Sequence, residues 1–310
     1  MPEPAVEISG LTKRYGELRA VDGLTLTLAA GQMMALVGPD GAGKTTLIRT
    51  LCGILPPDAG TVRLFGQDIV SGLARVKPMI GYLSQKFSMY GDLTVDENIE
   101  FFAEIHGVRD FAARRDQLLE FTRLTAFRGR LAERLSGGMK QKLALACTLV
   151  HTPRIIFLDE PTTGVDPVSR RDFWKILSGL LKTGLTIMLT TPYMDEAERC
   201  SLVGMMDRGR LLACAPPAAI KQRMAAGVVE LVCGDARAAS RALAQLPEVK
   251  EVQTFGDRLN IILDDVGRDW PAVQRHLDRT GIASDKWREI APSLENVFVS
   301  LMQGQKRENV

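Results

Sequence analysis

Residues 38–46, with the sequence GPDGAGKTT, combine residue types that can hold a phosphate group. They fit the pattern G-x-x-x-x-G-K-[ST], in which glycines let backbone N–H groups curl around the phosphates of a nucleotide. Lys44 supplies a charge that can reach the β- and γ-phosphates, and the Thr45 hydroxyl can ligate Mg²⁺. The loop residues of this predicted nucleotide site are Gly38, Asp40, Gly41, Ala42, Gly43, Lys44, Thr45 and Thr46.

The segments on either side of this loop support the prediction. Residues 32–37 form an apolar run typical of a buried strand, and residues 44–52 carry apolar residues at helical spacing before Gly53. The positive end of that helix would then face the anion. A glycine-rich turn without a ligand is the competing interpretation, and the agreement of motif and context disfavours it.

A second anion site is indicated by Ser136, Gly137 and Gly138, which precede a stretch with helical periodicity. Ser136 stands at the expected N-cap, so backbone N–H groups at the positive end of the helix are available to an anion. A simple helix cap is the commoner origin of such a triplet. The motif that follows in the chain favours the anion site.

That motif is an apolar run, residues 155–158, ending in Asp159 and Glu160. Such a run is typical of a strand buried in a parallel sheet, whose carboxyl end is where these sheets bind ligands. Asp159 suits Mg²⁺, and Glu160 is placed to polarise a water for attack on the γ-phosphate. A solvated loop is the alternative for an isolated Asp-Glu pair, and the two preceding motifs disfavour it.

Strands and helices of an α/β fold must position these motifs. A region without strand patterns, residues 93–150, predicts a helical subdomain in which Ile99, Phe102 and Ile105 form an apolar face. Strands are predicted at residues 6–11, as an edge strand, and at residues 23–28, 61–66, 79–83 and 185–191.

The last part of the chain has another pattern and predicts a small α+β domain. It contains nothing that looks catalytic, so we expect a regulatory or dimer-supporting role. The predicted division is a nucleotide-binding domain at residues 1–219, with its helical subdomain at about 86–150, and an accessory domain at 220–310. In the accessory domain the order is strand 228–232, helix 236–246, strands 249–255 and 259–263, helix 270–280, strand 286–290 and helix 293–302.

Composition indicates which kinds of partner and site this chain is expected to lack. The chain has 310 residues, 45% hydrophobic and 25% charged, with a net charge of +2, so bulk electrostatics favour no nucleic-acid partner. The five cysteines are scattered without a C-x-x-C pair, which predicts neither a zinc site nor a disulfide framework. Residues 1–4 are not typical of a signal peptide, and no apolar run approaches the ~18–20 residues of a membrane span. Any work on a membrane is therefore expected to proceed through partners.

The order and spacing of these motifs resemble those of ATP-binding cassette (ABC) ATPases over residues 5 to about 220. The likeness implies ATP and Mg²⁺ as cofactors, and a RecA-like core with an antiparallel β subdomain and a helical subdomain. It implies a role for Tyr15 in stacking on adenine, and for Asp166 in a segment that crosses to a second subunit. Gln85 would touch the metal and the nucleophilic water. The implied catalytic residues are Glu160, Gln85 and Lys44, and the implied metal ligands are Thr45, Gln85 and Asp159.

The stretches 38–41, 84–87, 135–142 and 193–198 resemble more closely the ATPase subunits of bacterial ABC-2 type exporters of the drug-resistance kind. The nearest likeness is to the N-terminal half of members with two cassettes in one chain. The implied partners are an ABC-2 type membrane permease and a second cassette, identical or different. The implied location is peripheral, at the cytoplasmic face of the inner membrane.

One position departs from the family pattern. Pro192 follows the strand at residues 185–191, where the family usually has a histidine that contacts the γ-phosphate. Proline has no polar side chain and no N–H to donate, and loss of such a donor costs roughly 10²–10³ in rate. Either Glu160 and Gln85 suffice and hydrolysis is slow, or this is the weaker member of an asymmetric pair whose complement is another chain or a second copy. A nucleotide-gated binding module with little turnover therefore stays open.

Soluble ABC ATPases that act on the ribosome or on DNA are the other alternative. The ribosomal kind usually has two cassettes and basic arms, and the DNA-repair kind inserts a long coiled coil before the signature. The +2 charge and the single cassette of this chain do not favour the ribosomal kind, and the gap between its phosphate loop and its signature is too short for the coiled coil of the DNA-repair kind. The residues do not indicate the cargo.

Overall fold

The computed structural model describes residues 4–86, 89–224, 226–282 and 286–308. Contacts divide the chain into two compact units, Met1–Cys214 and Ala215–Val310. The sequence placed this boundary after residue 219. The difference arises because helix α8 (Pro217–Gln222) packs against α11 (Leu294–Glu308) of the second unit.

The first sheet of the larger unit is antiparallel, with the order β2-β1-β4-β5. Ile8 of β1 pairs with Leu26 of β2 and with Val62 of β4, so the prediction that residues 6–11 form an edge strand is wrong. Alternation of apolar and polar residues identifies the buried face of a strand, but it does not show on which sides the strand has neighbours. The strands are β1 (Pro4–Tyr15), β2 (Leu18–Ala29), β4 (Ala59–Leu64) and β5 (Gln67–Asp68).

The second sheet has the order β10-β9-β3-β8-β7-β6. Strands β3, β7 and β8 are buried along their whole length, which explains their continuous apolar sequences. Strands β9, β3, β8, β7 and β6 each run parallel to their neighbours in this series. The carboxyl ends of these strands therefore meet at one edge of the sheet. The strands are β3 (Met33–Val37), β6 (Ile80–Leu83), β7 (Ile155–Asp159), β8 (Thr186–Thr190), β9 (Leu202–Asp207) and β10 (Arg210–Ala215).

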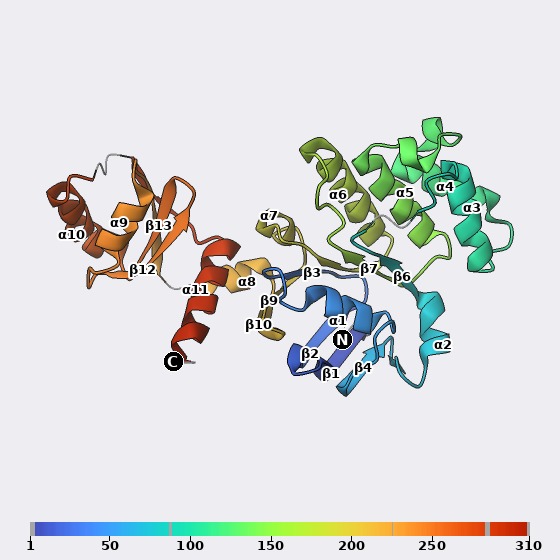
Figure 1. Cartoon of the computed structure of the whole chain (residues 1–310), viewed down its shortest axis with the longest axis horizontal. Coiled ribbons are helices and arrows are strands. Elements are labelled where there is room, and N and C mark those ends of the chain that lie inside the picture. The colour runs from blue at the N-terminus through green and yellow to red at the C-terminus, as the bar shows by residue number, and fades with distance from the viewer. Residues whose placement is uncertain (1–3, 87–88, 225, 283–285, 309–310) are drawn as a thin grey trace. The chain divides into compact units, whose positions relative to one another are not determined.

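Helix α1 (Lys44–Leu51) lies between the two sheets, and Figure 1 shows it beside β3 and β1. Leu47, Ile48 and Leu51 are buried in an apolar cluster that includes residues of both sheets. The phosphate loop therefore leads into a helix that is held on two sides. The other helices and turns outside the helical subdomain are α2 (Leu73–Val76), η1 (Lys77–Met79), α6 (Pro167–Lys182) and α7 (Met194–Ala197).

The helical subdomain is inserted between β6 and β7, as the sequence predicted. Ile99 is buried and Phe102 is half-buried, but Ile105 is 60% exposed, so the predicted apolar face is only partly covered. Ile105 lies in the last turn of α3, where its side chain lines a surface groove. The subdomain contains α3 (Val95–Ile105), α4 (Phe111–Thr122), η2 (Thr125–Phe127), η3 (Ala132–Arg134) and α5 (Gly137–Leu149).

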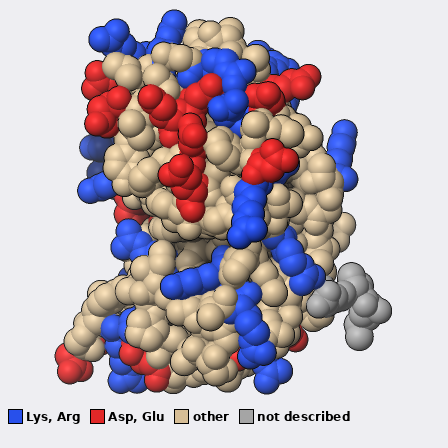
Figure 2. All heavy atoms as spheres, turned by 90° about the vertical axis from the view of Figure 1, so that its right-hand side faces the viewer, with Lys and Arg blue, Asp and Glu red and all other residues tan. Residues whose placement is uncertain are grey.

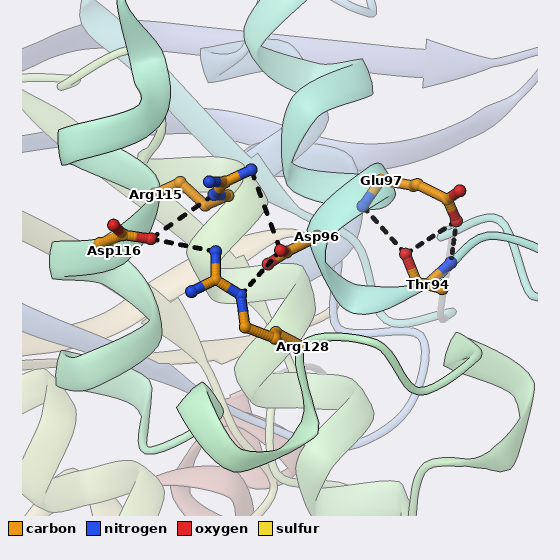
Figure 3. A network of polar contacts seen from close by, with 6 residues as sticks. All are labelled: Thr94, Asp96, Glu97, Arg115, Asp116 and Arg128. Atoms are coloured by element: carbon orange, nitrogen blue, oxygen red, sulfur yellow. Dashed lines mark hydrogen bonds and ion pairs between the residues drawn. The ribbon is translucent and has the colours of Figure 1, made fainter.

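A polar network joins the start of α3 to α4 and to the loop before α5 (Figure 3). The Asp96 carboxylate accepts a hydrogen bond from Arg128 at 2.8 Å, and Arg115 lies 3.9 Å from the same oxygen. Asp116 pairs with both arginines. Beside it, Thr94 caps α3 through a capping box with Glu97.

The segment before α3 and the segment before α5 lie side by side. The Ala132 N–H donates to the Leu93 carbonyl at 2.9 Å, and the Glu133 N–H donates to the Gly91 carbonyl at 3.0 Å. Asn98, which is fully buried, bonds the backbone of Tyr90 through both ends of its amide. The segment that leads into α3 is therefore joined to the segment that leads into α5.

The smaller unit has the predicted order β-α-β-β-α-β followed by a helix, and its sheet order is β12-β13-β11-β14. Helices α9 and α10 contribute to the apolar cluster that also contains Leu231 and Ile261 of the sheet. Gln253 and Asn296 exchange buried hydrogen bonds that attach α11 to β12. The elements are β11 (Gly227–Val232), α9 (Ala236–Leu243), β12 (Val249–Phe255), β13 (Arg258–Leu263), α10 (Val266–Arg279) and β14 (Trp287–Ile290).

In the described ranges, none of the helices combines the length and the apolar character required to cross a bilayer.

Candidate nucleotide site

The phosphate loop connects β3 to α1 at the carboxyl edge of the parallel sheet. Gly43 is the N-cap of α1 and has φ 100°, which side chains other than glycine rarely adopt. A Cβ at Gly43 would lie 2.0 Å from the Ala20 carbonyl oxygen, so a larger residue would displace the loop. The first turn of α1 therefore presents its unpaired N–H groups at the loop.

The charge of Lys44 is held inside the curve of this loop. Its ammonium donates to the carbonyls of Gly38 at 2.7 Å and Pro39 at 3.0 Å, and the residue is only 5% exposed. The loop thus keeps a positive charge beside its own N–H groups, where phosphate oxygens can replace the two carbonyls.

Thr45 and Asp159 meet where α1 approaches the end of β7. The Thr45 hydroxyl donates to Oδ1 of Asp159 at 3.0 Å, and the Thr190 hydroxyl donates to the same oxygen at 2.8 Å. The second oxygen, Oδ2, is buried and has no hydrogen-bond partner within the part of the chain that the structure describes. Carboxylate and hydroxyl oxygens are ligands that Mg²⁺ prefers, so these residues fit a magnesium ion.

Glu160 and Gln85 are brought together from different strand ends. The Gln85 side-chain amide donates to Oε2 of Glu160 at 2.8 Å, and the Thr163 hydroxyl donates to that oxygen at 3.2 Å. Glu160 is 8% exposed and has φ 49°, a left-handed conformation. Phe87, which the sequence likeness also used, lies outside the described residues.

A single cavity of about 670 Å³ contains most of the predicted site. This volume is ordinary for a ligand pocket. Tyr15 lies at its wall and is half exposed, which leaves its ring available to a base. Leu18, Arg19 and Arg208 also line the cavity, and the sequence did not predict this because they belong to no recognised motif. The predicted residues that line the cavity are Tyr15, Asp40, Gly41, Ala42, Gly43, Lys44, Thr45, Thr46, Gln85 and Glu160.

The remaining predicted contacts are not part of this cavity. Ser136 caps α5 by accepting the Met139 N–H at 3.4 Å, as predicted, and both Ser136 and Gly137 are exposed. Gly138 is buried against α6, and Asp166 caps α6. Ser136, Gly137 and Asp166 are therefore presented on the surface of the unit.

A family model described as "ABC transporter" matches residues 21–163. The chain is also 35% identical over 312 residues to the daunorubicin resistance ATP-binding protein DrrA3 of Streptomyces coeruleorubidus, and covers 98% of that protein. The chain belongs to the family of ABC transporter ATP-binding proteins. This membership confirms the resemblance, the cassette fold and, at the level of the family, the ATPase class.

A second relative of this cassette is the probable multidrug ABC transporter ATP-binding protein YbhF of Escherichia coli K12. It is 41% identical over 311 residues, which cover 98% of this chain and 53% of YbhF. The cassette therefore spans about half the length of that relative. A solved structure titled as the ATP-binding subunit of an ABC transporter has 26% identity and a TM-score of 0.65, covering 71% of this chain and 92% of that chain.

Pro192 follows β8 and is exposed, and its ring has no polar atom with which to contact a phosphate. Four residues later in the chain is Glu196, which is 1% exposed and whose structural role the sequence did not reveal. Its carboxylate accepts from Thr162 at 2.8 Å and from Thr191 at 2.6 Å, and Arg170 lies 3.5 Å away. These contacts join the segment after Glu160 to the segment that carries Pro192.

A groove of about 590 Å³ opens on another side of the cassette, between β6, α3 and the end of α5. His106 and His151 stack in its wall with ring centroids 3.9 Å apart, and burial lowers the pKa of both rings. Among the lining residues in the described part of the chain, Lys77 carries the formal charge. Figure 2 views the side of the molecule on which α2 and α3 lie, and shows a mainly uncharged hollow with acidic side chains above it and basic side chains below and beside it.

Proposed function

We propose that this cassette binds and hydrolyses ATP as the motor subunit of a membrane exporter of drugs or other amphipathic molecules. The observation that carries the proposal is the 2.8 Å hydrogen bond from Gln85 to Glu160 at the wall of the cavity that contains the phosphate loop. The printed names of DrrA3 and YbhF, a daunorubicin resistance protein and a probable multidrug protein, support export as the task.

The chemistry follows from the positions of the side chains. The loop N–H groups and Lys44 bind the phosphates, and the Glu160 carboxylate accepts a proton from a water that attacks the γ-phosphorus. The bond to the β–γ bridging oxygen breaks, and ADP and phosphate leave. Asp159 and Thr45 would hold Mg²⁺, which neutralises charge on the phosphate oxygens. Gln85 holds the Glu160 carboxylate toward the cavity.

A second cassette completes the site. Ser136, Gly137 and Asp166 are exposed and lie outside the cavity of their own chain, which suits residues that serve a neighbouring cassette. An ATP bound to one phosphate loop would be closed by Ser136 and Gly138 of the other cassette. The partner is a second copy of this chain or a related cassette.

The groove next to α3 is the proposed docking site for an ABC-2 type permease. Its exposed apolar residues, Ile54 and Ile105, suit the apolar face of a short cytoplasmic helix, and Lys77 suits an acidic residue beside that face. The cassette would then lie peripherally at the cytoplasmic face of the inner membrane.

The test is ATP turnover against protein concentration, for wild type and Glu160→Gln, with and without an ABC-2 permease in nanodiscs. A composite site predicts turnover per cassette that rises with concentration and is lost in the variant. Turnover that is independent of concentration in a monodisperse monomer would exclude the two-cassette site. Stimulation by the permease that is lost on Ile105→Asp would support docking in the groove.

A cassette with little turnover is the second candidate, and Pro192 is the observation that favours it. Equilibrium binding of ATP beside the turnover assay separates the two. Tight binding without turnover in any condition identifies the weaker partner of an asymmetric pair. In that case Pro192→His should raise turnover, because the imidazole restores a donor near the γ-phosphate.

A further inference from the structure

Thr190 is the last residue of β8, and its side chain contacts both Asp159 and Glu160. It is fully buried. Its hydroxyl donates to Oδ1 of Asp159 at 2.8 Å and accepts the backbone N–H of Glu160 at 2.9 Å. One hydroxyl therefore bonds both residues of the predicted metal and base pair.

The hydrogen bond to Asp159 orients its carboxylate. Oδ1 accepts from two hydroxyls, those of Thr45 and Thr190, while Oδ2 is buried without a partner in the described ranges of the chain. With Oδ1 fixed from the β8 side, the Oδ2 lone pairs remain available to a cation. Without the Thr190 hydroxyl, one of the two bonds that set this rotamer is lost.

The hydrogen bond that the Glu160 backbone N–H donates to the Thr190 hydroxyl stabilises the backbone conformation of Glu160. At φ 49° a residue other than glycine is strained, and such a conformation persists only where its surroundings hold it. The Glu160 N–H is shared between the hydroxyl of Thr190 at 2.9 Å and the carbonyl of Thr190 at 3.2 Å. This turn directs the Glu160 side chain to Gln85, with which it bonds.

We propose that Thr190 is a positioning residue that sets the Asp159 carboxylate for the metal and the Glu160 carboxylate for the water. It acts through these two residues and not by contact with the nucleotide. The proposal rests on the proposed ATPase function and deepens it.

Three variants test this role. Thr190→Val keeps the shape of the side chain and deletes the hydroxyl, and Thr190→Ser keeps the hydroxyl. Thr186→Val is the matched control, because Thr186 is a buried threonine on the same strand whose hydroxyl accepts the Gly31 N–H at 3.0 Å, away from the site. Melting temperatures of all variants establish that each protein is folded.

For Thr190→Val we expect turnover to fall about 10–100-fold, the usual effect of losing a residue that orients a metal ligand. The KM for ATP in the presence of Mg²⁺ should rise, and so should the Mg²⁺ concentration for half-maximal rate. Thr190→Ser should restore most of the rate, and Thr186→Val should resemble wild type. A rate for Thr190→Val equal to that of Thr186→Val, or no rescue by serine, would overturn the proposal.

Binding of a fluorescent ATP analogue, measured with Mg²⁺ and with EDTA, provides a readout that needs no turnover. Thr190→Val should bind like wild type in EDTA and should lose most of the added affinity that Mg²⁺ gives to wild type. An unchanged Mg²⁺ increment excludes the role of Thr190 at the metal. If wild type binds ATP but does not turn it over, the ATPase proposal fails, and the Mg²⁺ increment still decides the role of Thr190.

Discussion

The side-chain amide of Gln85 lies 2.8 Å from Oε2 of Glu160, although the two residues are 75 positions apart. Gln85 follows β6 and Glu160 follows β7, and these strands are parallel neighbours in the sheet. Gln85 is exposed and adjoins the segment that enters the helical subdomain, whereas Glu160 is almost fully buried. Under the proposed function, a displacement of the subdomain would act through Gln85 on the carboxylate that we propose accepts the proton of the attacking water.

A double-mutant cycle measures this coupling. Glu160→Gln should lower turnover by about 10²–10⁴-fold, as for loss of a general base, without loss of ATP binding. Gln85→Ala should lower turnover less, and should have a smaller effect when Glu160 is already replaced, since contacting residues are not additive. Gln117→Ala on the exposed face of α4 is the control. Additive effects in the cycle would contradict a functional Gln85–Glu160 bond.

Gly138→Ala tests the packing of the signature segment. A Cβ there would lie 2.4 Å from Cβ of Ser169, so the start of α5 must move away from α6. Overpacking of this kind lowers the free energy of unfolding by about 1–3 kcal/mol. ATP binding by the single chain should be retained, while concentration-dependent turnover should be lost.

Gly129→Ala is the control for that variant, because a Cβ at Gly129 would meet no described atom within 4 Å. Thermal unfolding and turnover are the measurements. Equal melting temperatures for the two alanine variants would show that α5 and α6 accommodate the methyl group without cost.

The Asp166 cap predicts a loss of stability in acid. Hydrogen bonds from the backbone and side chain of Ser169, and from the backbone of Val168, lower the pKa of Asp166. A lowered pKa in the folded state adds stability above the unfolded value, about pH 4, and that stability is lost as the pH falls through the folded pKa. Asp166→Asn keeps a capping side chain without the titration.

The measurement is the melting temperature of wild type and Asp166→Asn between pH 7 and pH 3. The wild-type curve should fall more steeply below about pH 4 than that of the variant. Parallel curves would mean that the cap does not contribute to the acid sensitivity of this unit.

Thiol reactivity should follow burial. Burial raises the pKa of Cys200 to about 12, and it raises the pKa of Cys52 and Cys147 well above the ordinary range. Because the thiolate is the nucleophile, these three side chains should resist alkylation at pH 8. Cys214 is half-buried and should be labelled first.

Peptide mass spectrometry after brief treatment with iodoacetamide checks this order. All five cysteines should be labelled in denaturant. Fast labelling of Cys147 in the folded protein would mean that the groove beside α3 opens to solvent.

The sequence predicted the parts of the site that depend on neighbours along the chain. Lys44 and Thr45 follow from one motif, and Asp159 and Glu160 from another, because covalent adjacency keeps the members of each motif together. Thr190 was not predicted, since its role depends on the pairing of Asp159 with Thr190 across β7 and β8, which no local pattern reveals. The edge-strand prediction for residues 6–11 failed for a related reason, because a strand's own residues do not identify its neighbours.

The order of elements in the smaller unit could also be predicted, because each strand and helix there has a clear period and a turn residue at its end. The apolar face with Ile105 was predicted correctly as a pattern, but its exposure was not. A period shows which side chains share a face, whereas the cover of that face depends on other segments.

The paired connections at Leu93 and Ala132 have a consequence for how this chain can vary. The segment that leads into α3 and the segment that leads toward α5 lie side by side, joined by backbone hydrogen bonds, and Asn98 holds the first of them. An insertion whose ends are adjacent can change in length without altering the scaffold that carries it. The part of the subdomain between residues 91 and 133, which contains α3 and α4, is therefore an exchangeable module. Under the proposed function, a different set of helices there would direct the cassette to another partner while the sheet kept its phosphate loop.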